Sequence, residues 1–420
     1  MAKQKSAFLD NLGKIYLMYT GVFILFVIGL GIAEKMGMSN KMIGYMFMFV
    51  TIGIYALIGV MSRTAKVSEY YVAGRSVPAF FNGMATGSDW MSAASFISMA
   101  GAIFGLGYDG LSYVMGWTGG YVLLAVFLGP YLRKFGQYTI PDFLGARYGG
   151  HAARTIGIIA AITASFTYLI AQVTGVGIIM SRFLSIDFTI GVFVGLGGIL
   201  VCSMLGGMKA VTWTQVAQYI ILILAYLTPV TVMSYRATGV PVSEIMYGQV
   251  LQKIDAKEKE IIADPKQKEV WDLWKKKSDN LTADIKGLPG SLDAKKKELQ
   301  DKLATLPADA PAADREKIGK DIKALPQTAE EAKEKWTAAQ KDAAGRSKPL
   351  KPYLEPFARM DAKNVLALIF CLMVGTAGLP HILMRYYTVP SVKDARISVG
   401  WSLFFIFLLY FTAPAYAAFA

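Results

Sequence analysis

The chain has 420 residues, of which 54% are hydrophobic and 12% aromatic, and its mean hydropathy is +0.41. These fractions exceed what a soluble domain usually carries. The net charge of +13 first suggests a nucleic-acid partner, but residues 236–363 hold 26 of the 43 Lys and Arg and 22 of the 30 Asp and Glu. The remaining charges fall almost entirely between apolar runs, as in the loops of a membrane protein, so we expect no nucleic-acid partner.

Apolar segments dominate the rest of the chain. A helix needs about 20 apolar residues to cross the hydrocarbon core. The first segment follows three lysines, as a signal peptide would, but it ends without a clear small-residue cleavage site, so we expect a retained anchor. The sequence therefore predicts an all-α polytopic membrane protein with about nine spans, at roughly 15–33, 42–61, 79–103, 112–132, 155–180, 188–205, 215–235, 364–384 and 397–420.

The basic residues predict the orientation of these spans. Cytoplasmic loops carry an excess of Lys and Arg. With the N-terminus in the cytoplasm, fourteen of the seventeen basic residues outside 236–363 fall inside, and only Lys35, Lys41 and Arg182 fall outside. This count assigns Arg385 to an inside loop. It also places residues 236–363 outside the membrane.

Residues 236–363 form the one segment of soluble character. They are rich in Lys, Glu, Asp and Ala, which favours solvated helices. Runs such as Lys275-Lys276-Lys277 are most simply a solvated face. A docking surface for a partner is the alternative interpretation of this segment.

The third apolar segment contains the chain's one acidic residue well inside a span, Asp89. A charged side chain at the centre of a bilayer costs about 2.5–3.5 kcal/mol on insertion scales, and such residues usually mark an ion or substrate pathway. A hydrogen-bonded Asp that stabilises helix packing is the alternative. We favour the pathway, because small and polar residues surround it in the stretch Gly83-Met-Ala-Thr-Gly-Ser-Asp-Trp-Met-Ser-Ala-Ala-Ser-Phe96.

The small residues of that stretch have two interpretations. Small residues at a helical spacing allow two helices to pack closely. Alternatively, the helix is interrupted, and its unwound backbone frees carbonyl groups for a cation and amide groups for an anion. Because close packing explains Asp89 and Trp90 less well, we expect Gly83, Gly87 and the serines to let the helix open.

A second interruption is predicted in the eighth apolar segment. Gly375, Gly378 and Pro380 lie within six residues and break an apolar run. Alone, this is a proline kink. Paired with the first interruption five spans earlier, it matches an inverted repeat in which corresponding helices are both discontinuous. His381, one of only two histidines, follows the break, and a structural hydrogen bond is its simpler interpretation over a proton relay.

Ordered motifs over about 42–235 and 364–420 resemble the sodium/solute symporter family, and most closely its cation/acetate symporter branch. The similarity rests on these stretches of the sequence: Glu69-Tyr-Tyr-Val-Ala-Gly-Arg75-Ser, Gly87-Ser-Asp-Trp-Met-Ser-Ala-Ala-Ser-Phe96, Gly107-Tyr-Asp-Gly110, Tyr138-Thr-Ile-Pro-Asp142, Gly206-Gly-Met-Lys-Ala-Val-Thr-Trp-Thr-Gln215 and Gly375-Thr-Ala-Gly-Leu-Pro-His-Ile-Leu-Met-Arg385.

The resemblance implies a leucine-transporter-type inverted-repeat fold. Residues 1–41 would add an extra N-terminal transmembrane helix, and 42–235 would hold one further helix and the first repeat. Residues 236–363 would be an extracytoplasmic helical insertion, and 364–420 would begin the second repeat with core helices six and seven. Core helix eight would be missing, so the fold is expected to be incomplete. On this basis we expect the chain alone not to transport.

The same resemblance implies a site. Sodium would bind between core helices one and eight, with backbone carbonyls of Ser88 and Met91 as ligands. Asp89 is offset by one residue from the family's aspartate and is predicted to belong to the ion pathway. Substrate contacts would fall on five residues, Ser92, Ser95, Gln172, Gly375 and Thr376.

The implied function is secondary active symport of a small monocarboxylate, such as acetate or pyruvate, with sodium or a proton. The expected surroundings are the lipid bilayer of a bacterial cytoplasmic membrane. One alternative is a sodium-coupled symporter of an amino acid such as proline. Another is a transporter-like sensor or interaction protein that docks a partner on 236–363. We do not expect an enzyme, because no apolar segment carries a nucleophile–base pair or a metal-ligand cluster.

Overall fold

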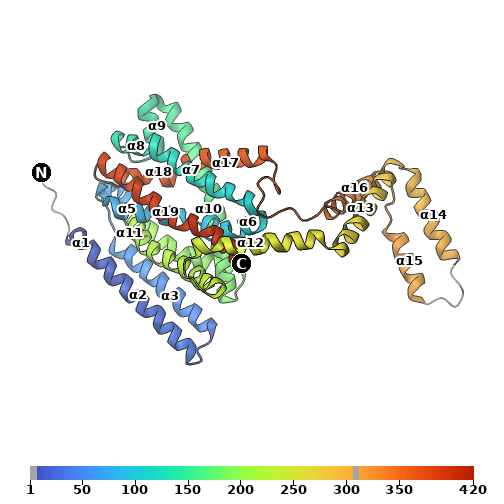
Figure 1. The fold of residues 1–420 in the computed structure, drawn as a ribbon. Coiled ribbons are helices and arrows are strands. Elements are labelled where there is room, and N and C mark those ends of the chain that lie inside the picture. Colours follow the sequence, from blue (N-terminus) through green and yellow to red (C-terminus); the bar gives the residue numbers. More distant parts are fainter. Residues whose placement is uncertain (1–6, 306–311) are drawn as a thin grey trace. The chain divides into compact units, whose positions relative to one another are not determined.

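A computed structural model describes residues 7–305 and 312–420, which are mostly helical and contain no strand (Figure 1). The chain forms two compact units, Met1–Leu251 with Leu354–Ala420, and Gln252–Tyr353. Lys3 and Lys5, which enter the charge count, lie outside the described residues.

The first unit contains the apolar helices. Its elements in chain order are α1 (Ala7–Asp10), α2 (Leu12–Lys35), α3 (Asn40–Met61), α4 (Val67–Val72), η1 (Ala73–Arg75), α5 (Ala79–Trp90), η2 (Ala93–Ser98), α6 (Met99–Leu106), η3 (Gly107–Gly110), α7 (Leu111–Phe127), α8 (Gly129–Phe135), α9 (Ile140–Tyr148), α10 (Gly150–Leu184), α11 (Phe188–Thr238), the start of α12 (Ser243–Ala263), α17 (Ala362–Ala377), α18 (Pro380–Leu383), η4 (Met384–Tyr387) and α19 (Val392–Phe419).

Among the described residues, six helical stretches are long and apolar enough to cross a membrane, and the bent pair Ala362–Ala377 and Pro380–Tyr387 makes a seventh. Helices cover all nine segments expected from the sequence. The number differs for two reasons. The segment 79–103 is divided after Trp90, and its second part is continuous in hydropathy with α7. The segments 188–205 and 215–235 share the single helix α11, in which the described residues give one long apolar stretch, Ser203–Thr238, and a shorter one, Phe188–Gly197.

Gly207 produces the kink inside α11. Its φ of 50° and ψ of −139° lie in a region that only glycine enters readily. A Cβ at this position would lie 2.5 Å from the carbonyl oxygen of Tyr70 in α4. The glycine therefore lets α11 turn directly against the short helix α4.

Each of the two interrupted helices packs against a helix from the other end of the first unit's sequence. α5 packs along α19, whereas α17 packs along α7. If α5 corresponds to α17 and α7 to α19, each interrupted helix contacts the second helix of the other repeat. This reciprocal pairing suits two repeats related by a pseudo-two-fold axis.

Gly83 and Gly87 make the contact between α5 and α19 close. A Cβ on Gly83 would lie 2.5 Å from Cβ of Trp401, and one on Gly87 would lie 2.9 Å from the ring of Tyr219 and 3.0 Å from Cβ of Phe405. Both glycines lie within the regular helix α5. The expectation that they open the helix was therefore wrong, because the interruption falls later, at Met91 and Ser92.

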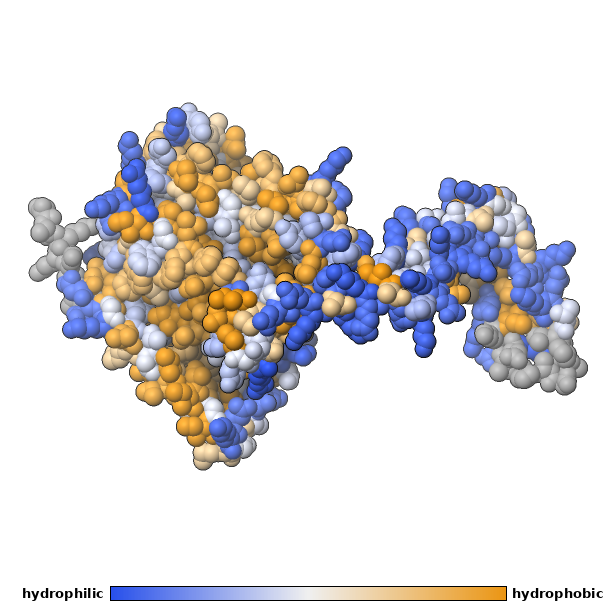
Figure 2. Space-filling model, viewed as in Figure 1, coloured by the Kyte–Doolittle hydropathy of each residue, from blue (hydrophilic) through white to orange (hydrophobic). Residues whose placement is uncertain are grey.

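The second unit is helical and small. It contains the end of α12, then α13 (Pro265–Lys286), α14 (Gly290–Ala304), α15 (Ala312–Ala324) and α16 (Ala329–Arg346). α13 packs against α16, and Leu292, Ala332 and Trp336 form a core of their own. Figure 2 shows hydrophilic side chains over most of this part, in contrast to the apolar surface of the helices of the first unit.

Candidate functional site

The first interruption separates α5 from η2, a π-helical turn. α5 ends at Trp90, and Ser92 has the extended φ and ψ of a helix cap. The hydroxyl of Ser92 accepts a hydrogen bond from the amide of Ser95 at 3.3 Å, and the hydroxyl of Ser95 accepts one from the amide of Ser92 at 3.1 Å. This reciprocal capping satisfies two amide groups that a helix start leaves free. The serines thus stabilise the break, as the sequence predicts.

Gln172 joins this break to α10. Its side-chain oxygen accepts a hydrogen bond from the amide of Ala93 at 3.0 Å. Gln172 does not line the cavity described below, whereas Ser92 and Ser95 do. In this conformation its observed partner is therefore the broken backbone.

The second interruption lies between α17 and α18, which are bent by 48°. The amide of Gly378 donates to the carbonyl oxygens of Val374 and Gly375, which ends α17, and Pro380 begins α18. Proline favours this first helical position, because its missing N–H would have no partner there. The position matches the break predicted from the sequence.

A cavity of about 810 Å³ lies between the two interruptions. Four of the five predicted substrate residues line it. Its wall is otherwise mostly apolar and aromatic, which is typical of a site for a small molecule. The lining residues come from α5, η2, α7, α10, α17, α18 and α19 and from the breaks between them. They include Asp89, Trp90, Ser92, Ser95, Trp117, Thr163, Thr167, Tyr168, Gly375, Thr376, His381 and Tyr410.

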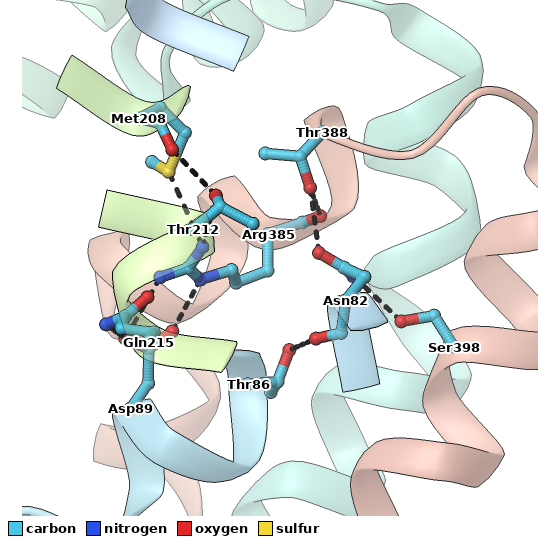
Figure 3. Close-up of polar contacts among 9 residues, drawn as sticks. All are labelled: Asn82, Thr86, Asp89, Met208, Thr212, Gln215, Arg385, Thr388 and Ser398. Atoms are coloured by element: carbon cyan, nitrogen blue, oxygen red, sulfur yellow. Dashed lines mark hydrogen bonds and ion pairs between the residues drawn. The ribbon is translucent and has the colours of Figure 1, made fainter. Parts of the chain in front are cut away.

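Asp89 lies at the wall of this cavity and is paired with Arg385 (Figure 3). Nε of Arg385 lies 2.5 Å from Oδ2 of Asp89, and its Nη2 lies 3.2 Å from Oδ1. The exposed fractions of the two side chains are 7% for Asp89 and 3% for Arg385. The pair is therefore a buried, bidentate ion pair, and the charge of Asp89 is balanced within the protein.

Helix α11 completes this network. Nη1 of Arg385 donates to the hydroxyl of Thr212 at 2.9 Å, and the side-chain amide of Gln215 donates to Oδ1 of Asp89. Figure 3 shows these groups converging from α5, α11 and η4. A buried ion pair contributes favourably only when further hydrogen bonds satisfy its remaining atoms, as they do here.

The assignment of Arg385 to a loop was wrong. The count of basic residues treats every Arg near the end of a span as loop charge, but Arg385 has an exposed fraction of only 2%. The signal that could have found it is Asp89 itself, since a carboxylate inside a span requires a partner. Two sequence motifs in fact contain the partners, Thr212 and Gln215 in one and Arg385 in the other.

His381 lies beside this pair in the same cavity. Its ring stacks on that of Tyr168 from α10, with centroids 4.6 Å apart and an interplanar angle of 29°. The structural hydrogen bond expected for His381 is not among the contacts of the described residues. His381 is also the one basic residue among those that line the cavity.

The predicted sodium ligands lie at the same interruption. Ser88 and Met91 are buried, and the carbonyl oxygen of Ser88 accepts a hydrogen bond from the amide of Met91 at 3.1 Å. Carbonyl oxygens suit a hard cation such as sodium. Their role as sodium ligands stays a prediction.

A second cavity of about 570 Å³ uses the same helices. Its lining includes Ile158, Ile162 and Ser165 of α10, together with Pro380 of α18 and Met384 of η4. Asp142 and Arg154 also line it and form an ion pair at 2.8 Å. The α10 residues that line the two cavities lie on nearly opposite faces of that helix, because the two sets are offset by about half a turn.

Comparisons with known proteins agree with this geometry. The model of the sodium:solute symporter family matches residues 70–279, which is half of the chain. An uncharacterized symporter of Cupriavidus necator is 45% identical over 96% of this chain and 62% of its own length.

Two less similar relatives are also named as transporters. A monocarboxylic acid transporter of Corynebacterium glutamicum is 26% identical over 90% of this chain and 55% of its own length. The uncharacterized symporter YwcA of Bacillus subtilis is 25% identical over 88% of this chain and 54% of its own length. The chain thus spans between half and two thirds of the curated relatives that it matches.

Proposed function

Because the chain belongs to the sodium:solute symporter family, we propose that it carries the substrate site of a secondary transporter for a small monocarboxylate. The cargo would be a short acid such as acetate or pyruvate, and it would move together with sodium or a proton. The substrate would occupy the cavity between the two interruptions, in contact with Ser92, Ser95, Gly375 and Thr376. Gln172 would act at its edge.

The charge of the cavity supports this substrate class. A zwitterionic amino acid needs an anionic partner for its ammonium group as well as a partner for its carboxylate. The one carboxylate at the cavity wall is Asp89, and Arg385 and Gln215 already bind it. An ammonium group would therefore have to displace a buried arginine. The monocarboxylate is favoured over proline on this ground.

The first interruption, at the end of α5, is the proposed site of the coupling ion. Sodium would bind the carbonyl oxygens of Ser88 and Met91, and Asp89 would act from the same turn of α5. Because Asp89 already forms an ion pair, we assign it to the ion pathway and not to direct coordination.

The membrane topology is proposed from charge. The N-terminus would face the cytoplasm of a bacterial cell, and residues 236–363 would lie outside the cytoplasmic membrane. A partner that docks on this segment would make the protein a sensor. Fusions of an alkaline phosphatase reporter after residues 63, 136, 240 and 350 test the topology, and activity only after 240 and 350 is the expected result.

Equilibrium binding tests the substrate class. The purified chain in lipid nanodiscs should bind acetate, propionate or pyruvate with a change in tryptophan fluorescence, because Trp90 and Trp117 line the cavity. Proline should produce no change. Tight binding of proline and none of the short acids would overturn the proposal. Counterflow of labelled acetate in liposomes, with and without sodium, then identifies the coupling ion.

A further inference from the structure

The cavity offers a carboxylate very few partners, and this restricts how an anion can bind. Asp89 and Arg385 neutralise one another at its wall. The lining residues contain His381 and no Lys or Arg. A carboxylate moved from water into such a site needs a cation or several hydrogen-bond donors, because burying an unpaired charge is costly.

Arg385 is poorly placed to serve as that cation. Its guanidinium lies behind Asp89, and Thr212 and Met208 of α11 hold its remaining nitrogen. A substrate would have to displace the carboxylate of Asp89 and leave it unpaired in the protein interior. Breaking a buried ion pair in this way costs about 3–5 kcal/mol.

His381 is well placed. Its ring stacks on Tyr168, which fixes its orientation at the cavity wall. No hydrogen bond joins its imidazole to another described residue. The titratable groups that line the cavity with it are Asp89 from α5, Tyr168 from α10, Cys371 from α17 and Tyr410 from α19, and Arg385 of η4 is paired with Asp89. Asp89 and Arg385 carry opposite charges and bind one another, so neither faces His381 as an isolated charge.

We propose that His381 in its protonated form is the anchor for the substrate carboxylate, so that binding of the anion takes up one proton. This inference rests on the proposed function and adds to it the group that selects a monoanion. The imidazolium donates a charge-assisted hydrogen bond to the carboxylate, and the proton enters the site with the cargo. The proton is lost again when the carboxylate leaves.

The pH dependence of binding follows from linkage. If only the protonated form binds the anion, the affinity falls about tenfold for each pH unit above the titration of free His381. Short carboxylic acids are almost fully ionised above about pH 6, so the acid itself does not titrate in this range.

The chain offers a direct measurement, because it contains only two histidines. In the variant His151→Gln, His381 is the sole imidazole, and nitrogen-15 labelled histidine gives one pair of imidazole signals. His151 lies at the start of α10, away from the lining of the cavity. Addition of acetate should keep the imidazole of His381 protonated at a pH about one unit higher. An unchanged titration in the presence of bound acetate would overturn the inference.

Two substitutions separate charge from shape. His381→Gln should weaken acetate binding at pH 6.5 and abolish its pH dependence, whereas His381→Lys should bind acetate with little change between about pH 6 and pH 8.5. His151→Gln alone should behave as the unmodified chain. If the His381→Gln protein binds acetate with the original pH dependence, His381 is not the anchor. If none of these proteins binds a monocarboxylate, the proposed function itself is wrong, and this inference falls with it.

Discussion

The carboxylate of Asp89 and the guanidinium of Arg385 lie 2.5 Å apart in the interior, although 296 positions separate them in the sequence. The pair joins the end of the first half-helix to the turn that follows the second interruption. Neither residue could be kept charged here without the other. The ion pair therefore helps to fix the end of α5 against the turn after the second interruption, together with the hydrogen bond from the hydroxyl of Thr388 to the side-chain oxygen of Asn82.

The first prediction concerns this pair. Asp89→Asn leaves Arg385 as a buried, uncompensated cation and should destabilise the protein by about 3–5 kcal/mol. The double variant Asp89→Asn, Arg385→Gln removes both charges and should recover a large part of that loss. Thermal unfolding of the three proteins in one detergent measures the coupling. Additive effects of the two substitutions would show that the ion pair does not exist.

The second prediction concerns the glycines of α5. Gly83→Ala should force a contact with Trp401, and overpacking of this kind costs about 1–3 kcal/mol. Gly101→Ala is the matched control on α6, since nothing lies within 4 Å of a Cβ there. If Gly83→Ala is as stable as Gly101→Ala in thermal unfolding, the close approach of α5 to α19 is incorrect.

Much of the fold could be predicted from the sequence. Hydropathy locates apolar helices at all nine expected segments, and Gly378 and Pro380 mark the second interruption where the structure has it. These signals are local. The length of an apolar run depends only on the residues of one span, and proline disrupts the hydrogen bonds of only one helical turn. Asp89 was also recognised, since its cost inside a span is visible without knowing its surroundings.

The partners of Asp89 could not be predicted in this way. Thr212 and Arg385 lie on other helices, far away in the sequence, and one sequence carries no direct information on such contacts. The roles of Gly83 and Gly87 were misjudged for the same reason. A glycine that accommodates a neighbouring helix and a glycine that opens its own helix look alike until the neighbour is known.

The third prediction concerns Glu69 in the short helix α4. The ammonium group of Lys209 lies 2.8 Å from its carboxylate, and this hydrogen bond lowers the pKa of Glu69 to about 2, with further contributions from Thr64 and Lys66. A lowered pKa means that the folded state holds the proton less tightly than the unfolded state. The stabilisation is therefore complete above about pH 4.5 and is lost as the pH falls towards 2.

Glu69→Gln should remove this stabilisation. Because Glu69 is partly exposed, we expect a loss of about 1 kcal/mol at neutral pH. The difference in melting temperature from the unmodified chain should shrink as the pH is lowered from 5 to 3. Glu34→Gln, at an exposed position at the end of α2, is the control and should change neither value. A difference that persists unchanged at pH 3 would contradict the assignment.

The fourth prediction concerns Asp109 at the end of the first interrupted helix. Its buried carboxylate accepts hydrogen bonds from the amides of Phe357, Arg359 and Met360, at 2.6, 2.8 and 2.8 Å. Asp109→Asn removes the charge and turns one acceptor into a donor that faces these amides. The segment before α17 should then open more often, and trypsin should cleave after Arg359 about tenfold faster, because one lost buried hydrogen bond costs about 1–3 kcal/mol.

The control for this experiment lies in the same segment. Glu355 is exposed, so Glu355→Gln changes the local charge without touching the contact with Asp109. It should leave the rate of cleavage after Arg359 unchanged. Equal rates in the Asp109→Asn protein and the control would show that Asp109 does not hold this segment.

The last prediction separates two roles of Gln172. If it holds the break by accepting a hydrogen bond from the amide of Ala93, Gln172→Glu keeps the acceptor, and its affinity for acetate should stay within about threefold of that of the unmodified chain. Gln172→Ala removes the acceptor and should lower the affinity for acetate about tenfold. If it instead donates its amide to the substrate, Gln172→Glu replaces that donor with a repelling charge and must be the weaker of the two. Thr174→Val, two residues further along α10 at an exposed position, is the control for changes in the helix itself. Tryptophan fluorescence titrations of the four proteins rank these affinities, and the order of the Glu and Ala variants decides which group Gln172 serves.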